Sequence, residues 1–242
     1  MSTIASRLLG PGVRLLRVAL SQDCVLCGAE TNDVPLCKPC RAELPTLARA
    51  CPSCAMPNRL GETCGTCLRR APPFDRTYAV WRYAYPVDRL VQALKFHGRL
   101  ALAPFFADAF GPVIERPHAE RVDILIPVPL HPERLAERGF NQAAEIARHL
   151  IARTRGHAMP LRIESRAARR VRRTLTQARL PFDQRASNVH GAFACSTDLK
   201  GARVAVVDDV MTTGATLAEL ANVLKRAGAA SVENWVVART ID

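Results

Sequence analysis

The chain has 242 residues, of which 48% are hydrophobic and 23% are charged. With a mean hydropathy of −0.01, this composition is typical of a soluble globular protein and excludes a disordered, collagen-like or membrane-embedded chain. Lys and Arg number 34 against 22 Asp and Glu, which gives a formal net charge of +12. This charge favours an anionic partner or substrate.

The first 20 residues are interrupted by arginines and by Pro11-Gly12. They contain neither the continuous apolar core of a signal peptide nor the roughly 18 apolar residues that a membrane span requires. We therefore expect residues 1–20 to form an amphipathic lead-in, with a membrane-surface anchor as the alternative. We expect the protein to be cytoplasmic, with no membrane span. A second apolar stretch, 100–114, contains two prolines and is expected to be an interrupted core helix.

Eight of the nine cysteines form four Cys-x-x-Cys pairs, and the last two pairs repeat the first two at an offset of 27 residues. Two thiolates three residues apart lie on one tight turn, and two such turns provide the four sulfurs of a tetrahedral zinc site. Sequential pairing gives one site from the first four cysteines and one from the other four, although a cross-braced pairing also fits the spacing. The eight ligands are Cys24, Cys27, Cys37, Cys40, Cys51, Cys54, Cys64 and Cys67.

A disulfide framework is the alternative interpretation of these cysteines. Such frameworks belong mainly to small secreted proteins, and nothing in the sequence directs this chain out of a reducing cytosol. We therefore expect one or two zinc ions in a small double zinc ribbon over residues 21–70. Four thiolates leave no position open for a catalytic water, so the zinc should fold the domain and take no part in a reaction.

After Pro72-Pro73, which we interpret as a linker, strand and helix patterns alternate. Apolar runs typical of strands occur at 78–83, 122–126, 204–207 and 232–238, and helical periodicity occurs at 87–96, 141–152 and 217–227. The run 204–207 is apolar without alternation, as expected for a central parallel strand covered on both faces. The pattern predicts an α/β domain over residues 75–242, with a mostly parallel sheet, helices on both faces and a ligand at the carboxyl ends of the strands.

The segment 206–216, Val-Val-Asp-Asp-Val-Met-Thr-Thr-Gly-Ala-Thr, lies where the 204–207 strand passes into a helix. A Thr- and Gly-rich turn at a helix N-terminus gathers N–H groups and hydroxyls around one point, which suits a phosphate monoester. Asp208 and Asp209 would repel that phosphate unless they accept hydrogen bonds from vicinal hydroxyls of the ligand. The predicted ligand is therefore a sugar phosphate. Alternatively, the aspartates only form a turn, and Thr216 with Glu219 only a capping box.

This loop resembles the signature of type I phosphoribosyltransferases, which bind 5-phosphoribosyl 1-pyrophosphate (PRPP). The resemblance implies that the two aspartates contact the ribose hydroxyls and that the segment 212–216 holds the 5′-phosphate. The PRPP-binding residues it implies in this loop are Asp208, Asp209, Val210, Met211, Thr212, Thr213, Gly214, Ala215 and Thr216.

Two further segments are 126–142, which contains Arg-Gly-Phe-Asn-Gln, and 173–177. Together with the eight cysteines they resemble the ComF family of competence-associated proteins, and the resemblance extends over nearly the whole chain from Cys24 onward. It implies a type I phosphoribosyltransferase-like fold behind the double zinc ribbon. It also implies a role in DNA uptake during natural transformation, or in the use of foreign DNA, with single-stranded DNA and the uptake machinery as partners.

Transfer from PRPP passes through a cation-like ribosyl centre while pyrophosphate leaves, so the site needs Mg²⁺ and fixed cations. The expected cations are Lys95, Arg138, Arg169 and Arg173. We expect Arg138 to be catalytic together with the two aspartates, because Gly139 beside it lets the backbone approach a ligand. By analogy, Val128 lies in a pyrophosphate-facing loop and binds PRPP. For each cation, a solvated surface charge is the alternative.

Eight arginines but only two acidic residues lie between 162 and 185. In an enzyme we expect this segment to be a flap over pyrophosphate, and in a nucleic-acid-binding protein a track for the phosphate backbone. Three functions follow: a PRPP-dependent transferase of unknown acceptor, a protein that handles single-stranded DNA, and a PRPP sensor without turnover. We predict the first two in one chain. The six histidines show no ligand spacing, and we expect them to be ordinary.

Overall fold

The computed structural model describes residues 22–31, 34–117, 122–154, 161–174 and 184–241. The predicted lead-in, residues 1–20, lies outside this range. The chain forms two compact units, Met1–Leu44 and Pro45–Asp242, so each unit contains four of the eight repeated cysteines. Within the described residues, no helix is both long enough and apolar enough to cross a membrane.

The described part of the smaller unit consists of three short elements. Strand β1 (Gln22–Asp23) pairs antiparallel with β2 (Glu30–Thr31), and helix α2 (Lys38–Ala42) follows. Cys24 and Cys27 lie in the turn between the strands, and Cys37 and Cys40 lie at the beginning of the helix. The first half of the cysteine repeat therefore folds around two tight turns.

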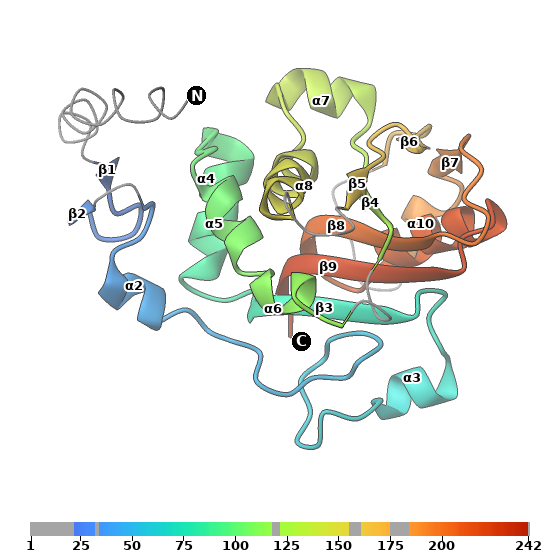
Figure 1. The fold of residues 1–242 in the computed structure, drawn as a ribbon, viewed down its shortest axis with the longest axis horizontal. Coiled ribbons are helices and arrows are strands. Elements are labelled where there is room, and N and C mark those ends of the chain that lie inside the picture. The colour runs from blue at the N-terminus through green and yellow to red at the C-terminus, as the bar shows by residue number, and fades with distance from the viewer. Residues whose placement is uncertain (1–21, 32–33, 118–121, 155–160, 175–183, 242) are drawn as a thin grey trace, which may run out of the picture. The chain divides into compact units, whose positions relative to one another are not determined.

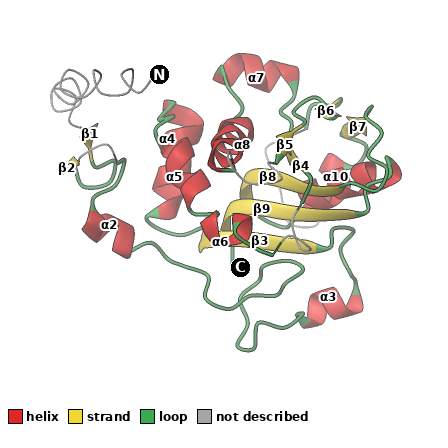
Figure 2. Cartoon of the chain, viewed as in Figure 1, coloured by secondary structure: helices red, strands yellow, loops and turns green. Residues whose placement is uncertain are grey.

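The larger unit is built on a five-stranded sheet in which every pairing is parallel, as Figures 1 and 2 show. The strand order is β3-β9-β8-β4-β5. The strands are β3 (Arg76–Arg82), β4 (Ile124–Pro127), β5 (Arg162–Ile163), β8 (Arg203–Met211) and β9 (Ser231–Arg239). A separate antiparallel pair contains β6 (Ala168–Arg170) and β7 (Phe193–Cys195). The predicted parallel sheet is confirmed.

Helices cover both faces of this sheet. Helix α8 (Gln142–Arg153) packs on β4, β8 and α5 (Leu102–Asp108), whereas α10 (Ala215–Arg226) packs on β9 and β7. Alternate strand residues point to opposite faces: Ile126 and Val206 join a core cluster with Leu220 of α10, while the equally buried Leu125 lies outside that cluster. The helices of the larger unit are α3 (Gly65–Arg69), α4 (Val87–His97), α5 (Leu102–Asp108), α6 (Gly111–Ile114), α7 (Pro132–Arg138), α8 (Gln142–Arg153), α9 (Gln184–Val189) and α10 (Ala215–Arg226).

The central strand differs in length from its prediction. The run 204–207 was expected to be the strand, but β8 continues to Met211, because its backbone keeps pairing with β9 up to Arg239. Asp208 and Asp209 therefore lie within the last part of the strand and not in a turn after it. The central position of β8, between β9 and β4, is as predicted.

Two other segments discussed in the sequence analysis contain regular secondary structure. The apolar stretch 100–114 is interrupted as expected and contains α5 and α6. The arginine-rich segment is partly regular structure: β5 extends the main sheet and β6 pairs with β7. Residues 175–183 of that segment lie outside the described range.

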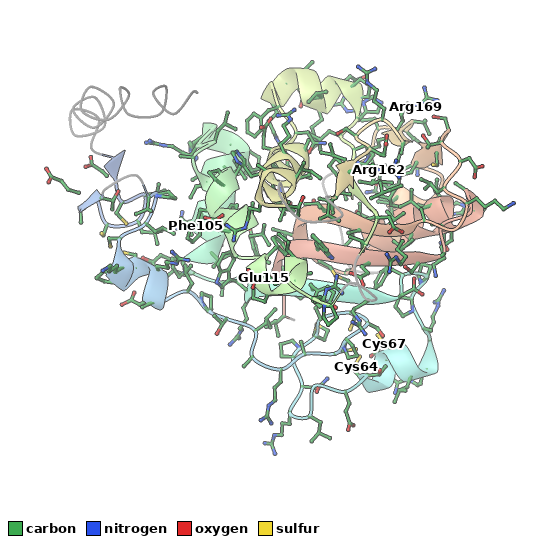
Figure 3. The ribbon with its side chains drawn as sticks, in the orientation of Figure 1. Cys64, Cys67, Phe105, Glu115, Arg162 and Arg169 are labelled. Carbon is green, nitrogen blue, oxygen red and sulfur yellow. The ribbon has the colours of Figure 1, made fainter. Side chains whose placement is uncertain are left out.

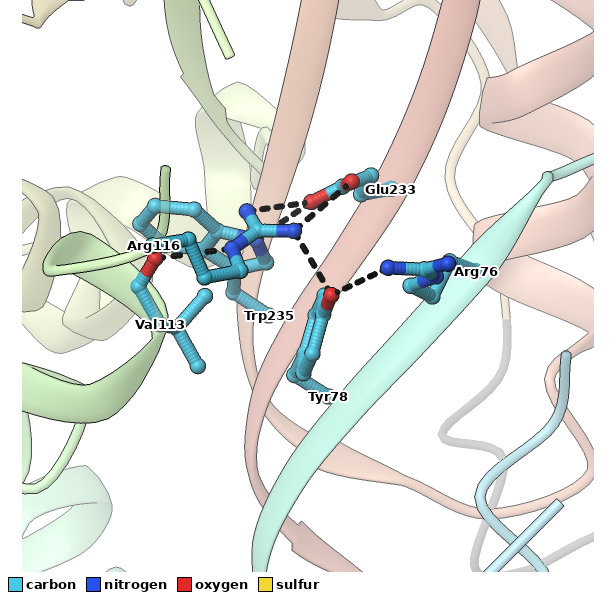
Figure 4. A network of polar contacts seen from close by, with 6 residues as sticks. All are labelled: Arg76, Tyr78, Val113, Arg116, Glu233 and Trp235. Carbon is cyan, nitrogen blue, oxygen red and sulfur yellow. Dashed lines mark hydrogen bonds and ion pairs between the residues drawn. The ribbon is translucent and has the colours of Figure 1, made fainter. Parts of the chain in front are cut away.

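A polar cluster fastens the end of α6 to the amino-terminal half of the sheet (Figure 4). The guanidinium of Arg116 donates to Glu233 of β9 (Nη2 to Oε2, 2.9 Å) and to the carbonyl of Val113 (Nε to O, 2.8 Å). It also lies 4.6 Å from the centre of the Tyr78 ring on β3. These charges are largely buried and hydrogen-bonded within the fold, so they stabilise the sheet at the end opposite to the aspartates.

Candidate functional site

The two cysteine tetrads have the same internal geometry. In each, the four Sγ atoms lie within 4.8 Å of one another, and the members are the first four and the last four cysteines of the repeat. Cys64 and Cys67, at the beginning of α3, are labelled in Figure 3. The pairing is therefore sequential, and the cross-braced alternative is excluded.

Backbone N–H groups lower the pKa of one cysteine in each tetrad, whereas a hydrogen bond from Cys37 raises the pKa of Cys40 and burial raises that of Cys54. Burial raises the pKa of Cys24, but backbone N–H groups, chiefly that of Cys37, outweigh it and lower the pKa to about 6. In the second tetrad burial again raises the pKa of Cys51, and N–H donors lower it to about 7; one of them is the amide of Cys64, 3.3 Å from the Cys51 sulfur. Thiolate is the form that binds zinc. Both donor sets fit structural, four-sulfur zinc sites.

A cleft of about 220 Å³ opens at the carboxyl ends of β4 and β8. It brings together predicted residues from four separated parts of the sequence. The predicted residues that line it are Lys95, Val128, Arg138, Arg173, Asp208, Asp209, Val210, Met211, Thr212, Gly214, Ala215 and Thr216. Thr213 belongs to the same turn but is not among the lining residues.

The turn between β8 and α10 presents a run of backbone amides at the beginning of a helix. Among the described residues, none accepts a hydrogen bond from the amides of Thr212, Thr213 or Gly214. Gly214 has a φ of +82°, a left-handed conformation that favours glycine, and a Cβ there would lie 2.6 Å from Cε of Met211, whose side chain would have to move. These amides stand at the N-terminus of a 12-residue helix, where the helix dipole also favours an anion.

The capping-box alternative for this turn is wrong. The N-cap of α10 is Gly214, which has no side chain to donate or accept. Oε1 of Glu219 instead accepts a hydrogen bond from the amide of Gly191, at 2.8 Å. The threonines and the glycine of the turn are therefore not accounted for by a capping box.

The two aspartates have different surroundings. Asp209 is 3% exposed, and its Oδ2 lies 2.8 Å from Nζ of Lys95, which comes from the last turn of α4. Burial lowers the pKa of Lys95, but the charge of Asp209 outweighs it and raises the pKa, so the ammonium is retained. Burial and then the Asp209 charge raise the pKa of the half-buried Asp208 to about 7. One carboxylate is thus neutralised by a fixed cation, and the other titrates near neutral pH.

The Arg-Gly-Phe-Asn-Gln element shapes the opposite wall of the cleft. Asn141 is the N-cap of α8, and its Oδ1 accepts from the amides of Ala143 and Ala144. Its Nδ2 donates to the carbonyl of Val128 at 3.0 Å, which fixes the loop after β4. Gly139 ends α7 with a φ of +82°. The element therefore positions the chain between β4 and α8.

Arg138, the predicted catalytic cation, lies at this wall. Its guanidinium donates to Oε1 of Gln142 and lies 5.5 Å from the centre of the Phe96 ring. Burial lowers the pKa of Arg138, and the nearby charge of Asp209 opposes that effect. The side chain is thus held in place beside the acidic pair by contacts on two sides.

Of the two cations predicted in the arginine-rich segment, Arg173 lines the cleft and Arg169 does not. Arg169 is exposed and is not among the lining residues, whereas Arg170 is half-buried and lines the cleft, because neighbouring residues of β6 point to opposite sides. Arg173 lines the cleft, but its guanidinium also lies 2.6 Å from the carboxylate of Glu133 on α7. Figure 3 labels Arg169 beside β6.

Family models match both parts of the chain. A double zinc ribbon domain matches residues 15–68, and a phosphoribosyl transferase domain matches residues 135–241. A purine phosphoribosyltransferase from Pyrococcus horikoshii aligns over 67% of this chain and 87% of its own at 18% identity, with a TM-score of 0.29, a likeness too small to carry weight.

Curated relatives cover most of the chain. The DNA utilization protein YhgH of Escherichia coli is 35% identical over 85% of this chain and 91% of its own. Competence protein F of Haemophilus influenzae is 28% identical over 93% of both chains, and competence protein ComFC of Bacillus subtilis is 26% identical over 86% of this chain and 85% of its own. This chain belongs to the ComF family. The ComF fold, a phosphoribosyltransferase-type parallel sheet preceded by a double zinc ribbon, is as predicted.

Sequence reasoning missed several residues of this ComF cleft. His131 was expected to be ordinary, yet it lines the cleft, and its buried Nδ1 has no hydrogen-bond partner among the described residues. Arg134, one turn further along α7, and Tyr83, after β3, also line it. The histidine and Arg134 belong to the same 126–142 element that carried the resemblance, so their proximity to Arg138 was the available signal. Tyr83 had none.

Proposed function

We propose that this ComF protein binds PRPP together with Mg²⁺ in the cleft at the carboxyl ends of β4 and β8. The observation that carries the proposal is the turn 212–214, whose amides have no acceptor among the described residues and stand beside two aspartates and a group of cations. Amides at a helix N-terminus suit the 5′-phosphate. Carboxylates suit a diol, because they accept hydrogen bonds from both hydroxyls.

Each part of the ligand has a complementary group in this arrangement. Asp209, paired with Lys95 at 2.8 Å, would accept from one ribose hydroxyl and Asp208 from its neighbour. Arg138 and Arg170 would face the pyrophosphate, where their charges stabilise the leaving group as it develops. Bound Mg²⁺ would supply further neutralisation of the pyrophosphate oxygens.

The binding test uses the acidic pair. The double variant Asp208→Asn, Asp209→Asn should weaken PRPP binding in Mg²⁺ by roughly 100-fold or more, since each carboxylate makes charge-assisted hydrogen bonds. Calorimetric titration measures it. Asp198→Asn, at an exposed position, is the matched control. Tight binding of PRPP by the double variant would refute the proposal.

We propose further that the bound PRPP is a phosphoribosyl donor. The proposal does not name the acceptor of the phosphoribosyl group, because no lining residue has been assigned as the general base that would activate it. Incubation with PRPP, Mg²⁺ and candidate acceptors, with pyrophosphate release as the readout, tests the transfer. Binding of PRPP without release in the presence of any acceptor would favour the alternative of a sensor that regulates a partner.

A second proposed activity is contact with single-stranded DNA in the cytoplasm, during DNA uptake or the use of foreign DNA. Its support is the net charge of +12 and the four arginines that line the cleft, Arg134, Arg138, Arg170 and Arg173. The relatives are named for competence and DNA utilization, and the uptake machinery is the corresponding partner. The affinity for an oligonucleotide should fall with salt, with a slope of about −0.7 per phosphate contacted. A flat dependence would exclude this activity.

A further inference from the structure

Arg239, the last residue of β9, is a buried arginine that lies under the turn 212–214. It is 6% exposed and stands in register with Met211 of β8. Its Nη1 donates to the carbonyl of Met211 at 3.2 Å and also to the carbonyl of Thr212. Sequence reasoning gave this residue no role, because it lies 30 positions beyond Asp209 at an ordinary strand end.

The hydrogen bonds of Arg239 fix the direction of the loop amides. In a planar trans peptide, the C=O and the following N–H point in opposite directions. When Arg239 holds the carbonyls of Met211 and Thr212, the amides of Thr212 and Thr213 must point away from it. These are the amides that have no acceptor among the described residues. Arg239 thus holds the turn in the orientation that an anion requires.

The same guanidinium reaches the second cysteine tetrad. Its Nε donates to the carbonyl of Cys54 at 3.0 Å. The two carbonyls before it are also held by the sheet. Thr77 of β3 donates its amide N–H to the carbonyl of Pro52 (2.9 Å) and its hydroxyl to the carbonyl of Ser53 (2.7 Å). Three of the four carbonyls of this Cys-x-x-Cys turn, those of Pro52, Ser53 and Cys54, are therefore fixed from the sheet. The position of the Cys54 carbonyl in turn depends on the fold of the tetrad, which its metal sets.

We propose that Arg239 is a positioning residue that makes the phosphate-binding turn depend on metal in the second tetrad, and not on metal in the first. The planar fork of arginine suits this role, because one side chain donates to the Cys54 carbonyl through Nε and to the turn through Nη1. The identity of the ligand in this inference rests on the proposed binding of PRPP. The orientation of the turn does not depend on that proposal.

Variants of Arg239 test the positioning. Arg239→Met should weaken PRPP binding by roughly 10- to 100-fold, as expected when hydrogen bonds from a charged donor are lost, and should speed hydrogen exchange at the amides 211–216. Arg239→Lys should restore part of both, because it keeps a donor for the turn but cannot span to Cys54. The control is Arg203→Met, which breaks an ion pair with Asp123 (2.8 Å) at the beginning of β8 and should leave the turn unchanged.

A pair of matched cysteine variants tests the dependence on metal. Cys64→Ser and Cys37→Ser occupy equivalent positions of the repeat, 27 residues apart, and each should lower the zinc content by about one ion per chain. Only Cys64→Ser should speed exchange at 211–216. In the Arg239→Met background, Cys64→Ser should speed exchange at 211–216 only a little further. If Cys64→Ser acted through a general loss of stability, its full effect on exchange would be added to that of Arg239→Met.

The outcomes separate this inference from the proposed function. Wild-type protein that binds no PRPP refutes the proposed function, yet the exchange measurements still test Arg239. If Arg239→Met is folded and its amides 211–216 exchange as in the wild type, the positioning role is refuted. If Arg239→Met does not fold, Cys64→Ser in the full chain decides alone: unchanged exchange at 211–216 with one zinc lost refutes the dependence on metal.

Discussion

The two cysteine tetrads share one sequence pattern but differ in their surroundings. The first lies in the unit Met1–Leu44, between a two-stranded pair and a five-residue helix. The second lies in the larger unit, where β3 and β9 hold the carbonyls of its first turn. A repeated motif therefore identifies the metal chemistry of both sites, but only the contacts of the backbone show which of them supports the cleft.

The strongest test of this comparison removes ligands from each tetrad in turn. Cys51→Ser with Cys67→Ser should lower the unfolding free energy of the larger unit by about 3 kcal/mol or more, because structural zinc contributes directly to folding. Both cysteines are buried. Urea unfolding, followed by the fluorescence of Trp81 and Trp235, measures the change.

The control for that test is the equivalent change in the first tetrad. Cys24→Ser with Cys40→Ser occupies the corresponding positions of the repeat and should leave the same tryptophan transition within about 0.5 kcal/mol of the wild type, as expected for changes outside the unit. Equal losses from the two double variants would contradict the distinction between the tetrads.

The same contrast, equal residue types in unequal surroundings, appears in β6 at Arg169 and Arg170, of which only Arg170 lines the cleft. Arg170→Met should weaken PRPP binding by about tenfold, because it removes a lining cation near Asp208. Arg169→Met, on the exposed side of β6, should change the affinity by less than about twofold. Titration calorimetry in Mg²⁺ compares them. A larger effect at Arg169 would reverse the assignment of the two side chains.

A feature of the structure could be predicted from the sequence where it depends on residues that are close together in the chain. Hydrophobic periodicity is local, so it predicted four of the five strands of the main sheet, the helices α4, α8 and α10, and the central place of β8. The cysteine spacing predicted the eight ligands but left two ways of pairing them. The turn 212–216 was recognisable because its residue types are needed for one conformation. The sequence could not show that Arg170, and not Arg169, lines the cleft, because this depends on how β6 pairs with β7.

Contacts between distant segments were also beyond prediction. The pair of Lys95 with Asp209 and the bonds from Arg239 to Cys54 join residues more than 100 positions apart, and no local pattern specifies them. The prediction that Lys95 belongs to the site used only its charge. Arg239 had no distinguishing signal, since a lone arginine at a strand end is ordinarily a solvated charge. Its burial under the turn is a property of the folded sheet.

The smallest expected effect concerns the two aspartates, again equal residues in unequal surroundings. The pKa of Asp208 is raised to about 7 from its ordinary value of 3.8, so between these values the folded protein binds more protons than the unfolded chain. Stability contributed by this group is therefore present at low pH and is lost as pH rises through 7. Because solvent reaches the half-buried carboxyl, we expect a total loss of about 1 kcal/mol.

Asp208→Asn isolates this contribution, because the amide resembles the protonated acid and does not titrate. Urea unfolding at several pH values between about 4 and 8 should show the wild type losing stability relative to the variant as pH rises. Asp198→Asn, at an exposed position, should run parallel to the wild type. A variant that instead loses stability relative to the wild type with rising pH would mean that the folded state favours the ionised Asp208, and the two aspartates would then be alike in charge as well as in sequence.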